Sequence, residues 1–152
     1  MLEIEMRGQA EGGSRQAPTG VLVTRRATFA AAHTLRRTDW DEDRNRSVFG
    51  ACAGDHGHNY QLEVSVAGVP EPDTGMVVNL KDLDQAMRLA VIEKVDHRHL
   101  NRDVDFLRGR IPTAENLALA FWMELEKALP DGSLRRVRLV ESENNSVEVF
   151  RG

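Results

Sequence analysis

The feature that most constrains the fold is an alternating apolar pattern that ends in a histidine. From residue 21 onward one alternating register is apolar and is broken only at Arg25. Its members are Val21, Val23, Ala27, Phe29 and Ala31. A period of two is typical of a half-buried strand, whose side chains point alternately to the two faces of a sheet. The next position on the apolar face is His33, so the sequence predicts a strand that ends in an imidazole.

A second alternating segment begins with histidines instead of ending with one. Its apolar face carries Tyr60, Leu62, Val64 and Val66, and its polar face carries Gln61, Glu63 and Ser65. Extended backwards, the same register places His58 and His56 on the apolar face. If the two strands pair antiparallel, the three imidazoles converge at one edge of the sheet. Residues 34–54 between them are polar and predict a long loop, which commonly serves a site.

Two helices are predicted after the second strand. Apolar residues at helical spacing predict one helix over residues 79–95, with Asn79 as its N-terminal cap. A similar pattern predicts a second helix over residues 113–129, with Thr113 as its cap. Glu115 lies in the first turn of this helix, where a negative charge favours the helix dipole, and by itself it indicates no more than a helix start.

The chain closes with a predicted β-hairpin. Its strands cover residues 134–143 and 146–150, and its turn lies at Asn144-Asn145, because asparagine tolerates the positive φ that such turns use. On the first strand Glu141 follows Val137 and Leu139 on an apolar face. A carboxylate in that position needs a partner. The partner is either an arginine of the core or the N–H groups of a ligand.

The order of predicted elements is β-β-α-α-β-β. It indicates an α+β fold, with a four-stranded antiparallel sheet and two helices on one face. A chain of 152 residues forms one domain, which we place over residues 21–152. Residues 1–20 are rich in Gly, Gln, Glu and Ser without a sustained period, and they predict a mobile tail.

Composition excludes several classes of function. The net charge of −4 argues against a general nucleic-acid binder, which needs a basic surface. No apolar run approaches the roughly 20 residues of a membrane helix. The acidic first residues also argue against a secretory signal. The lone Cys52 suits a reducing compartment, so we expect a cytoplasmic enzyme or binding protein.

The three histidines form a candidate metal site. Three protein nitrogens with an open fourth position are how catalytic zinc is held. Imidazole also binds nickel, copper and iron, so zinc is favoured among several metals. Two alternatives remain open. A His-x-His pair also arises by accident on protein surfaces, and Cys52 would supply the fourth ligand of a closed structural site.

The thiol and a second histidine cluster are candidates for proton transfer. Cys52 lies among small residues four positions before His56, where a nearby cation lowers a thiol's pKa, and the alternative is a buried inert cysteine. Asp96 precedes His97, and a carboxylate beside an imidazole orients it as a general base. The alternative is a solvated helix end, where positive side chains are favourable. We interpret His99 as a surface or packing residue.

Taken together, these segments resemble the 6-pyruvoyltetrahydropterin synthase family, which includes the bacterial 6-carboxytetrahydropterin synthases. The resemblance runs from about Val21 to Gly152. Seven motifs occur in the family's order: Phe29-Ala30-Ala31-Ala32-His33, Phe49-Gly50-Ala51-Cys52, His56-Gly57-His58-Asn59-Tyr60, Thr74-Gly75-Met76-Val77-Val78-Asn79-Leu80, Asp96-His97, Pro112-Thr113-Ala114-Glu115-Asn116, and Glu141 ahead of Asn144-Asn145.

The resemblance implies both a fold and a reaction. The fold is the tunnelling fold, in which subunits join their sheets into a barrel, commonly as a homohexamer of two trimers with active sites between subunits. The substrate is 7,8-dihydroneopterin triphosphate, and a zinc-dependent lyase reaction releases triphosphate from it. The product is either 6-pyruvoyltetrahydropterin, in a tetrahydrobiopterin-type pathway, or 6-carboxytetrahydropterin, toward queuosine, with loss of acetaldehyde.

The resemblance also implies roles for individual residues. The positions that match the zinc ligands are His33, His56 and His58. The positions that match the proton-transfer groups are Cys52, as general base, and Asp96 with His97, as its relay. Glu141 matches the carboxylate that accepts hydrogen bonds from the pterin N–H groups. Thr113 and Glu115 match secondary pterin contacts. Arginines of the polar loop are candidates to receive the triphosphate.

The motifs do not agree on the branch of the family. Only Ala53-Gly54-Asp55 separates Cys52 from the next histidine, as in the bacterial 6-carboxy type. Phe49-Gly50, with residues 74–77 and Asn79, instead resembles the 6-pyruvoyl type. Ala30 stands where many relatives carry serine, and we expect this change to be tolerated.

Two other functions compete with the lyase. The first is a zinc-stabilised pterin-binding module without catalysis, which the joint presence of Cys52, Asp96 and His97 disfavours. The second is another pterin enzyme of the same fold, such as an aldolase or cyclohydrolase, which the placement of the three histidines disfavours.

Overall fold

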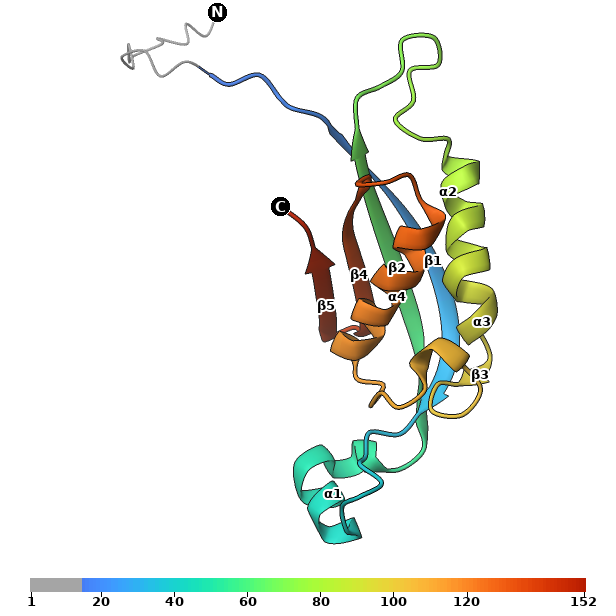
Figure 1. Cartoon of the computed structure of the whole chain (residues 1–152). Helices are drawn as coiled ribbons and strands as arrows, with labels where there is room; N and C mark the ends of the chain where they lie inside the picture. Colours follow the sequence, from blue (N-terminus) through green and yellow to red (C-terminus); the bar gives the residue numbers. More distant parts are fainter. Residues whose placement is uncertain (1–14) are drawn as a thin grey trace, which may run out of the picture.

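The computed structural model describes residues 15–152, and a single five-stranded sheet runs through them in the order β3-β1-β2-β4-β5 (Figure 1). The strands are β1 (Val21–His33), β2 (His56–Gly68), β3 (Arg98–His99), β4 (Leu134–Ser142) and β5 (Asn145–Phe150). The α-helices are α1 (Glu42–Phe49), α2 (Leu80–Met87), α3 (Glu93–Val95) and α4 (Ala114–Ala128). Shorter helical segments are η1 (Gly50–Ala53), η2 (Arg88–Ile92) and η3 (Asp105–Leu107).

The predicted α+β class is confirmed, whereas the predicted four-stranded antiparallel sheet is wrong. The sheet has a fifth strand, β3, which pairs parallel with β1 at Ala31 and Ala32. The flanking backbone extends this contact, because the His97 N–H donates to the Ala30 carbonyl at 2.6 Å and the Leu100 N–H to the Ala32 carbonyl at 2.8 Å. Two residues cannot show an alternating pattern, so no periodicity predicts this strand.

The first two strands pair as predicted, and their register positions the histidines. β1 and β2 run antiparallel along their full lengths, with Phe29 opposite Tyr60, Ala31 opposite His58 and His33 opposite His56. The odd-numbered residues of β1 pair with the even-numbered residues of β2, so their side chains lie on the same side of the sheet. Together they form one continuous apolar face that ends at the three imidazoles.

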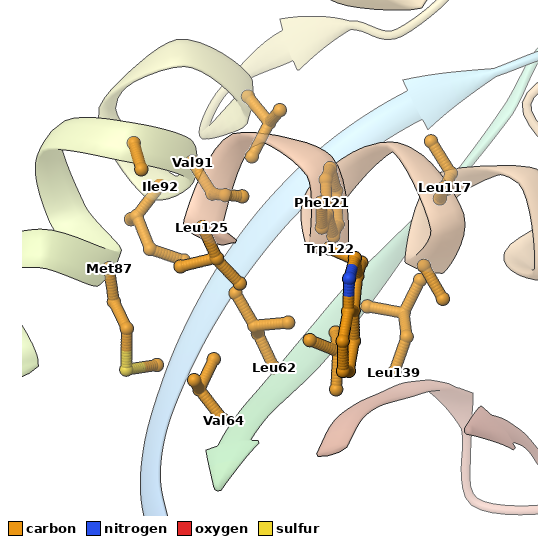
Figure 2. Close-up of a cluster of buried hydrophobic side chains, with 14 of the residues drawn as sticks. Leu62, Val64, Met87, Val91, Ile92, Leu117, Phe121, Trp122, Leu125 and Leu139 are labelled. Carbon is orange, nitrogen blue, oxygen red and sulfur yellow. The ribbon is translucent and has the colours of Figure 1, made fainter. Parts of the chain in front are cut away.

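Helices α2 and α4 cover that apolar face (Figure 1). Figure 2 shows the core that results, in which strand residues meet helix residues. The labelled residues are Leu62, Val64 and Leu139 from the strands and Met87, Val91, Ile92, Leu117, Phe121, Trp122 and Leu125 from the helical segments. Each fully buried Leu or Phe contributes about 1.5–3 kcal/mol to folding. The Phe29 ring stacks on Tyr60, with ring centroids 4.7 Å apart, which extends the core toward the histidines.

Both helix caps occur where the sequence places them. The Asn79 side chain accepts from the Lys81 N–H at 3.0 Å, and the Thr113 hydroxyl accepts from the Asn116 N–H at 3.2 Å. The helix predicted over residues 79–95 consists of α2, a π-helical turn (η2) and α3. The wider π turn lets Ala90, Val91 and Ile92 all be buried, which regular helical spacing does not predict.

The segment predicted as a polar loop folds into α1 and η1, which lie beyond the ends of β1 and β2 (Figure 1). Asp41 caps α1 by accepting from the Arg44 N–H at 2.8 Å. Asn45 is fully buried, and its amide nitrogen donates to the carbonyls of Arg37, Trp40 and Asp41. Polar contacts organise this segment, so apolar periodicity could not reveal it.

The face of the sheet opposite the helices is polar and internally paired. On this open face Glu63 accepts from Arg26 at 2.7 Å and from Arg138 at 2.6 Å, so its carboxylate joins three adjacent strands. The Ser65 hydroxyl, which is fully buried, lies 2.7 Å from the Thr24 hydroxyl. The predicted position of Glu63 and Ser65 on this second face is confirmed, and the structure shows that Glu63 is almost fully buried there.

Two smaller predictions need revision. The hairpin turn is made by Glu143 and Asn144, one residue earlier than predicted, and the only non-glycine residue with positive φ among residues 15–152 is His97. Most of the predicted mobile tail, residues 1–14, lies outside the described residues, and residues 15–20 are exposed and without regular structure. In residues 15–152 no helix combines the length and the apolar character that crossing a bilayer requires.

Candidate metal centre and active site

The structure brings together the three histidines that the strand pattern places on one face. The ring centroids of His33 and His56 are 4.5 Å apart, those of His33 and His58 are 5.1 Å apart, and those of His56 and His58 are 5.0 Å apart. One nitrogen from each ring lies within 4.8 Å of the others. His33 is fully buried, and the other two are partly buried at the ends of their strands. This spacing suits one cation held by three imidazoles.

Hydrogen bonds fix the ring orientations of two of these histidines. Nδ1 of His33 donates to the Pro112 carbonyl and Nδ1 of His56 donates to the Gly54 carbonyl, each at 2.8 Å. Because Nδ1 carries the proton, Nε2 keeps its lone pair free. Hydrogen bonds of this kind orient a histidine for binding a metal ion through Nε2. Nε2 of His56 and of His58 are buried and have no hydrogen-bond partner within the described part of the chain. Buried nitrogens of this kind fit a metal ion well.

The electrostatics keep His33 neutral. Its pKa is lowered to about 4, mainly by burial and to a smaller extent by the neighbouring His56 and His58, while the Pro112 carbonyl acts in the opposite direction. A neutral imidazole is the form that binds metal. The Tyr60 hydroxyl lies 3.4 Å from Nδ1 of His33. Burial, reinforced by the charge of Glu141, raises the pKa of this phenol above its ordinary range, so it stays protonated.

Glu141 reaches the same cluster from β4. Its Oε1 lies 3.7 Å from Nε2 of His58, and both side chains are largely buried. Among residues 15–152 no arginine or lysine lies within ion-pair distance of this carboxylate, so the core-arginine interpretation is not supported. A cleft of about 400 Å³ lies beside it, and Glu115 lines that cleft too. The carboxylate is therefore placed to receive the N–H groups of a ligand.

Cys52 lies near this end of the sheet but outside the histidine cluster. It is partly buried in η1, and its carbonyl accepts from the Leu35 N–H at 2.8 Å. Among the described residues, the three histidines are close enough to share a metal ion. The Cys52 sulfur is not part of this group. This geometry gives no support to a closed structural site with the thiol as fourth ligand.

Asp96 and His97 form the predicted carboxylate–imidazole pair. Oδ1 of Asp96 accepts from the Ala30 N–H at 2.9 Å and lies 3.0 Å from Nδ1 of His97. The Ala30 N–H, with a smaller contribution from His97, lowers the pKa of the Asp96 carboxyl, so it is ionised at neutral pH. His97 has a φ of 58° and its side chain is 83% exposed.

The Asp96–His97 pair lies at the edge of β1. His97 lines a pocket of about 550 Å³ together with residues 30–32 of β1, residues 57–59 of β2, and Arg98 and His99, so His58 of the cluster belongs to the same lining. Among these residues, Ala30, Ala32 and Asn59 alternate with those that carry the clustered imidazoles, so their side chains belong to the open face of the sheet. The structure therefore places the two sets of candidate proton-transfer groups on different elements, with Cys52 in η1 and the Asp96–His97 pair at the edge of β1.

Sequence reasoning missed the role of His99. Its Nε2 donates to Asp55 at 2.9 Å, its Nδ1 accepts from the Asn101 N–H at 3.3 Å, and its side chain is only 15% exposed. This imidazole connects β3 to Asp55, the residue that precedes His56. The interaction depends on the unpredicted parallel strand, so no local signal could have revealed it.

Comparison with known proteins agrees with this geometry. The model of the family described as 6-pyruvoyl tetrahydropterin synthase matches residues 22–151. The chain belongs to this family. A human family member, 6-pyruvoyl tetrahydrobiopterin synthase, is 40% identical over 144 residues, covering 93% of this chain and 97% of the relative. The resemblance drawn from the motifs is thus confirmed, as is the prediction that the chain is an enzyme of this family.

Two further relatives bear on the fold and on the branch. The structure of the Caenorhabditis elegans 6-pyruvoyl tetrahydropterin synthase matches with a TM-score of 0.82 and 32% identity, covering 88% of this chain and 96% of that one. The Bacillus subtilis 6-carboxy-5,6,7,8-tetrahydropterin synthase is 31% identical over 108 residues, covering 69% of this chain and 66% of the relative. The family therefore spans both of the branches that the motifs indicated.

Proposed function

We propose that this chain is a zinc-dependent lyase that acts on 7,8-dihydroneopterin triphosphate and releases triphosphate. The observation that carries the proposal is the convergence of three imidazoles, with buried, unpartnered Nε2 atoms on His56 and His58, beside the carboxylate of Glu141. A three-histidine set favours zinc and leaves a coordination position for substrate. The 40% identity to the human synthase supports the reaction class.

The residues around the cluster have separate roles in binding the metal and the pterin. Zinc held by the three histidines would act as a Lewis acid that polarises the hydroxyls of the substrate side chain and acidifies the neighbouring C–H. Glu141 accepts N–H groups of the pterin ring, and Glu115, which lines the same cleft, adds a contact. Thr113 caps α4 and thereby fixes the turn that carries Glu115.

Proton transfer is assigned to Cys52 with Asp96 and His97. Cys52 takes the proton from the substrate carbon, and the Asp96-oriented imidazole of His97 exchanges protons with the reacting groups. Because His97 is 83% exposed and opens on the other face of the sheet, we assign it to a site completed by another subunit.

The free edges of the sheet support this assembly. β5 is one edge strand, and β3 covers the outer edge of β1 only at Ala31 and Ala32. Uncovered strand edges pair readily with another chain. We therefore propose that subunits join their sheets into a barrel, as a homohexamer of two trimers, with active sites at the interfaces.

We assign the product as 6-pyruvoyltetrahydropterin, for a tetrahydrobiopterin-type pathway. The 6-pyruvoyl relatives from human and Dictyostelium discoideum reach 40% and 39% identity over 93% and 87% of this chain, against 31% over 69% for the 6-carboxy relative. The short link between Cys52 and His56 favours the 6-carboxy product of a queuosine-type pathway, which stays the alternative. The lone Cys52 supports a cytoplasmic location, with residues 21–152 acting as one domain.

Product analysis tests these assignments directly. Zinc-loaded protein is incubated with 7,8-dihydroneopterin triphosphate, and the products are identified by mass spectrometry. We expect inorganic triphosphate and 6-pyruvoyltetrahydropterin. A carboxy product with acetaldehyde would move the enzyme to the other branch. Pterin binding without any release of triphosphate would instead favour the non-catalytic binding module.

A further inference from the structure

A second cleft is lined by residues that are chain neighbours of His33 and Pro112. It has a volume of about 480 Å³, within the range of about 300–1,000 Å³ that is usual for small-molecule sites. Thr34 on one wall follows His33 directly, and Ile111 on another wall precedes Pro112, whose carbonyl holds the His33 ring. We call it the arginine cleft, and its polar lining includes Thr34, Arg36, Arg37, Asn101, Arg102 and Arg110.

We propose that the arginine cleft binds the triphosphate group of the substrate. This inference rests on the proposed function, because it assumes that the pterin substrate carries a triphosphate. Four guanidinium groups line the cleft against the single carboxylate of Asp39. The planar fork of N–H groups on arginine matches phosphate oxygens and keeps its charge at any physiological pH. Because Thr34 and Ile111 of the lining are chain neighbours of His33 and Pro112, we infer that a substrate held at the cluster reaches the cleft with its triphosphate group.

The arginines are not equally available to a ligand. Arg36 donates to Glu42 at 2.6 Å, and Arg37 makes a two-point contact with Asp39 at 2.8 and 2.7 Å. Arg102 lies 3.5 Å from a carboxylate oxygen of Asp55.

Arg110 differs from these three. Among the described residues no carboxylate forms an ion pair with it within 4.0 Å, and its one side-chain hydrogen bond is to the Met123 sulfur at 3.9 Å. A thioether sulfur is a weak acceptor, so nearly all the donor capacity of this guanidinium is left for a ligand. Arg110 is therefore the residue on which the proposal depends most.

The walls of the cleft are held in place by the chain itself. The buried Asn45 accepts from the Arg37 N–H at 2.8 Å and donates to the Arg37 carbonyl at 3.0 Å. Asn101 holds Thr34 in the same reciprocal way, accepting from its N–H at 2.8 Å and donating to its carbonyl at 2.9 Å. An anion entering the cleft meets fixed backbone, which lowers the entropic cost of binding.

The test compares Arg110→Ala with Arg108→Ala in zinc-loaded protein. Arg108 is two residues away, 75% exposed, paired with Asp105 and outside the lining, so its variant makes the same charge change nearby. Inorganic tripolyphosphate is titrated by calorimetry, and zinc content is measured before and after, since tripolyphosphate chelates zinc. We expect about a 10- to 100-fold loss of tripolyphosphate affinity in Arg110→Ala, and no loss in Arg108→Ala.

Substrate specificity supplies the second measurement. Arg110→Ala should raise the KM for 7,8-dihydroneopterin triphosphate and leave the affinity for unphosphorylated 7,8-dihydroneopterin unchanged. Equal tripolyphosphate affinity in both variants and in the original protein would overturn the proposal, as would an equal loss for both pterins. If the original protein releases no triphosphate yet Arg110→Ala still loses tripolyphosphate binding, the proposed function fails and the anion site remains.

Discussion

The two faces of the sheet carry different chemistry, although their residues alternate along the same strands. On the helix-covered face Phe29 and Tyr60 lead to an imidazole cluster whose geometry is set by burial and by backbone acceptors. On the open face Glu63 is held by two arginines, and His97 stands 83% exposed near the edge of β1. The covered face suits groups that must stay rigid, and the open face suits groups that are completed by another chain.

The difference also appears in how each histidine is held. His33 is fixed by close packing and a buried hydrogen bond, so its position does not depend on a ligand. His97 has a left-handed backbone conformation, which costs an L-residue roughly 1–2 kcal/mol. The Ala30 backbone stabilises that conformation through the Asp96 carboxylate and the His97 N–H. A strained, exposed residue held in this way is typical of a functional position.

The largest expected effect is on the covered face. His56→Ala removes one of three nitrogens and should reduce zinc content from about one ion per chain to a small fraction, with loss of turnover. Metal analysis after dialysis measures the zinc, and triphosphate release measures activity. His97→Ala on the open face is the matched control and should keep its zinc. Retention of full zinc by His56→Ala would show that the cluster is not the metal site.

On the open face, His97→Ala should lower kcat by about 10²–10⁴-fold, the usual contribution of a general acid or base. Zinc content and thermal stability should stay near those of the original protein, because the side chain is exposed. Steady-state kinetics on zinc-loaded variants checks this. A higher KM with an unchanged kcat would assign His97 to substrate binding instead.

Mixing the two inactive variants sharpens the comparison of the faces. If each active site takes its histidine cluster from one subunit and His97 from another, oligomers reassembled from His56→Ala and His97→Ala contain some intact sites. We therefore expect partial recovery of turnover after co-refolding or co-expression. A mixture as inactive as its components would place all the catalytic groups on one chain.

A moderate effect is expected for Glu141→Gln, at the border of the histidine cluster. The substitution removes the charge that accepts pterin N–H groups and should weaken pterin binding about 10- to 100-fold, with zinc retained. Fluorescence or calorimetric titration with 7,8-dihydroneopterin measures the change. Glu143→Gln, in the exposed hairpin turn two residues later, is the control and should bind normally. Equal affinity in the two variants would count against the assigned role of Glu141.

Strand alternation and cap chemistry predicted the parts of the molecule that depend on local sequence. They located β1 and β2, aligned His33 with His56 and His58, and identified both helix caps. Each of these features repeats over many residues or depends on one short-range hydrogen bond.

The remaining features depend on contacts between distant residues. The two-residue strand β3 exists because the Ala30–Ala32 edge of β1 accepts it. Helix α1 is organised by the buried polar side chain of Asn45, which an apolar pattern does not register. The position of the Asp96–His97 pair at the edge of β1 follows from the same β3 contact, so the sequence identified these residues without showing where they lie.

The smallest expected effect concerns the open face, in Glu63→Gln. Arg138, and then Arg26, hold the pKa of the Glu63 carboxyl below its ordinary value of 4.5. A lowered folded-state pKa gives stability that is present above pH 4.5 and is lost as the pH falls through the folded pKa. We expect the free energy of unfolding to fall by about 1–2 kcal/mol at pH 7, or the Tm by roughly 2–8 °C, and the difference to be smaller at acidic pH.

Thermal melts of both proteins from pH 7 to pH 3 measure this effect. Glu148→Gln is the control, because Glu148 pairs with Arg138 too but is 42% exposed, so its loss should matter less. A difference in Tm that stays constant with pH would mean that packing, and not charge, makes Glu63 stabilising. The open face would then resemble the covered one in how it is held.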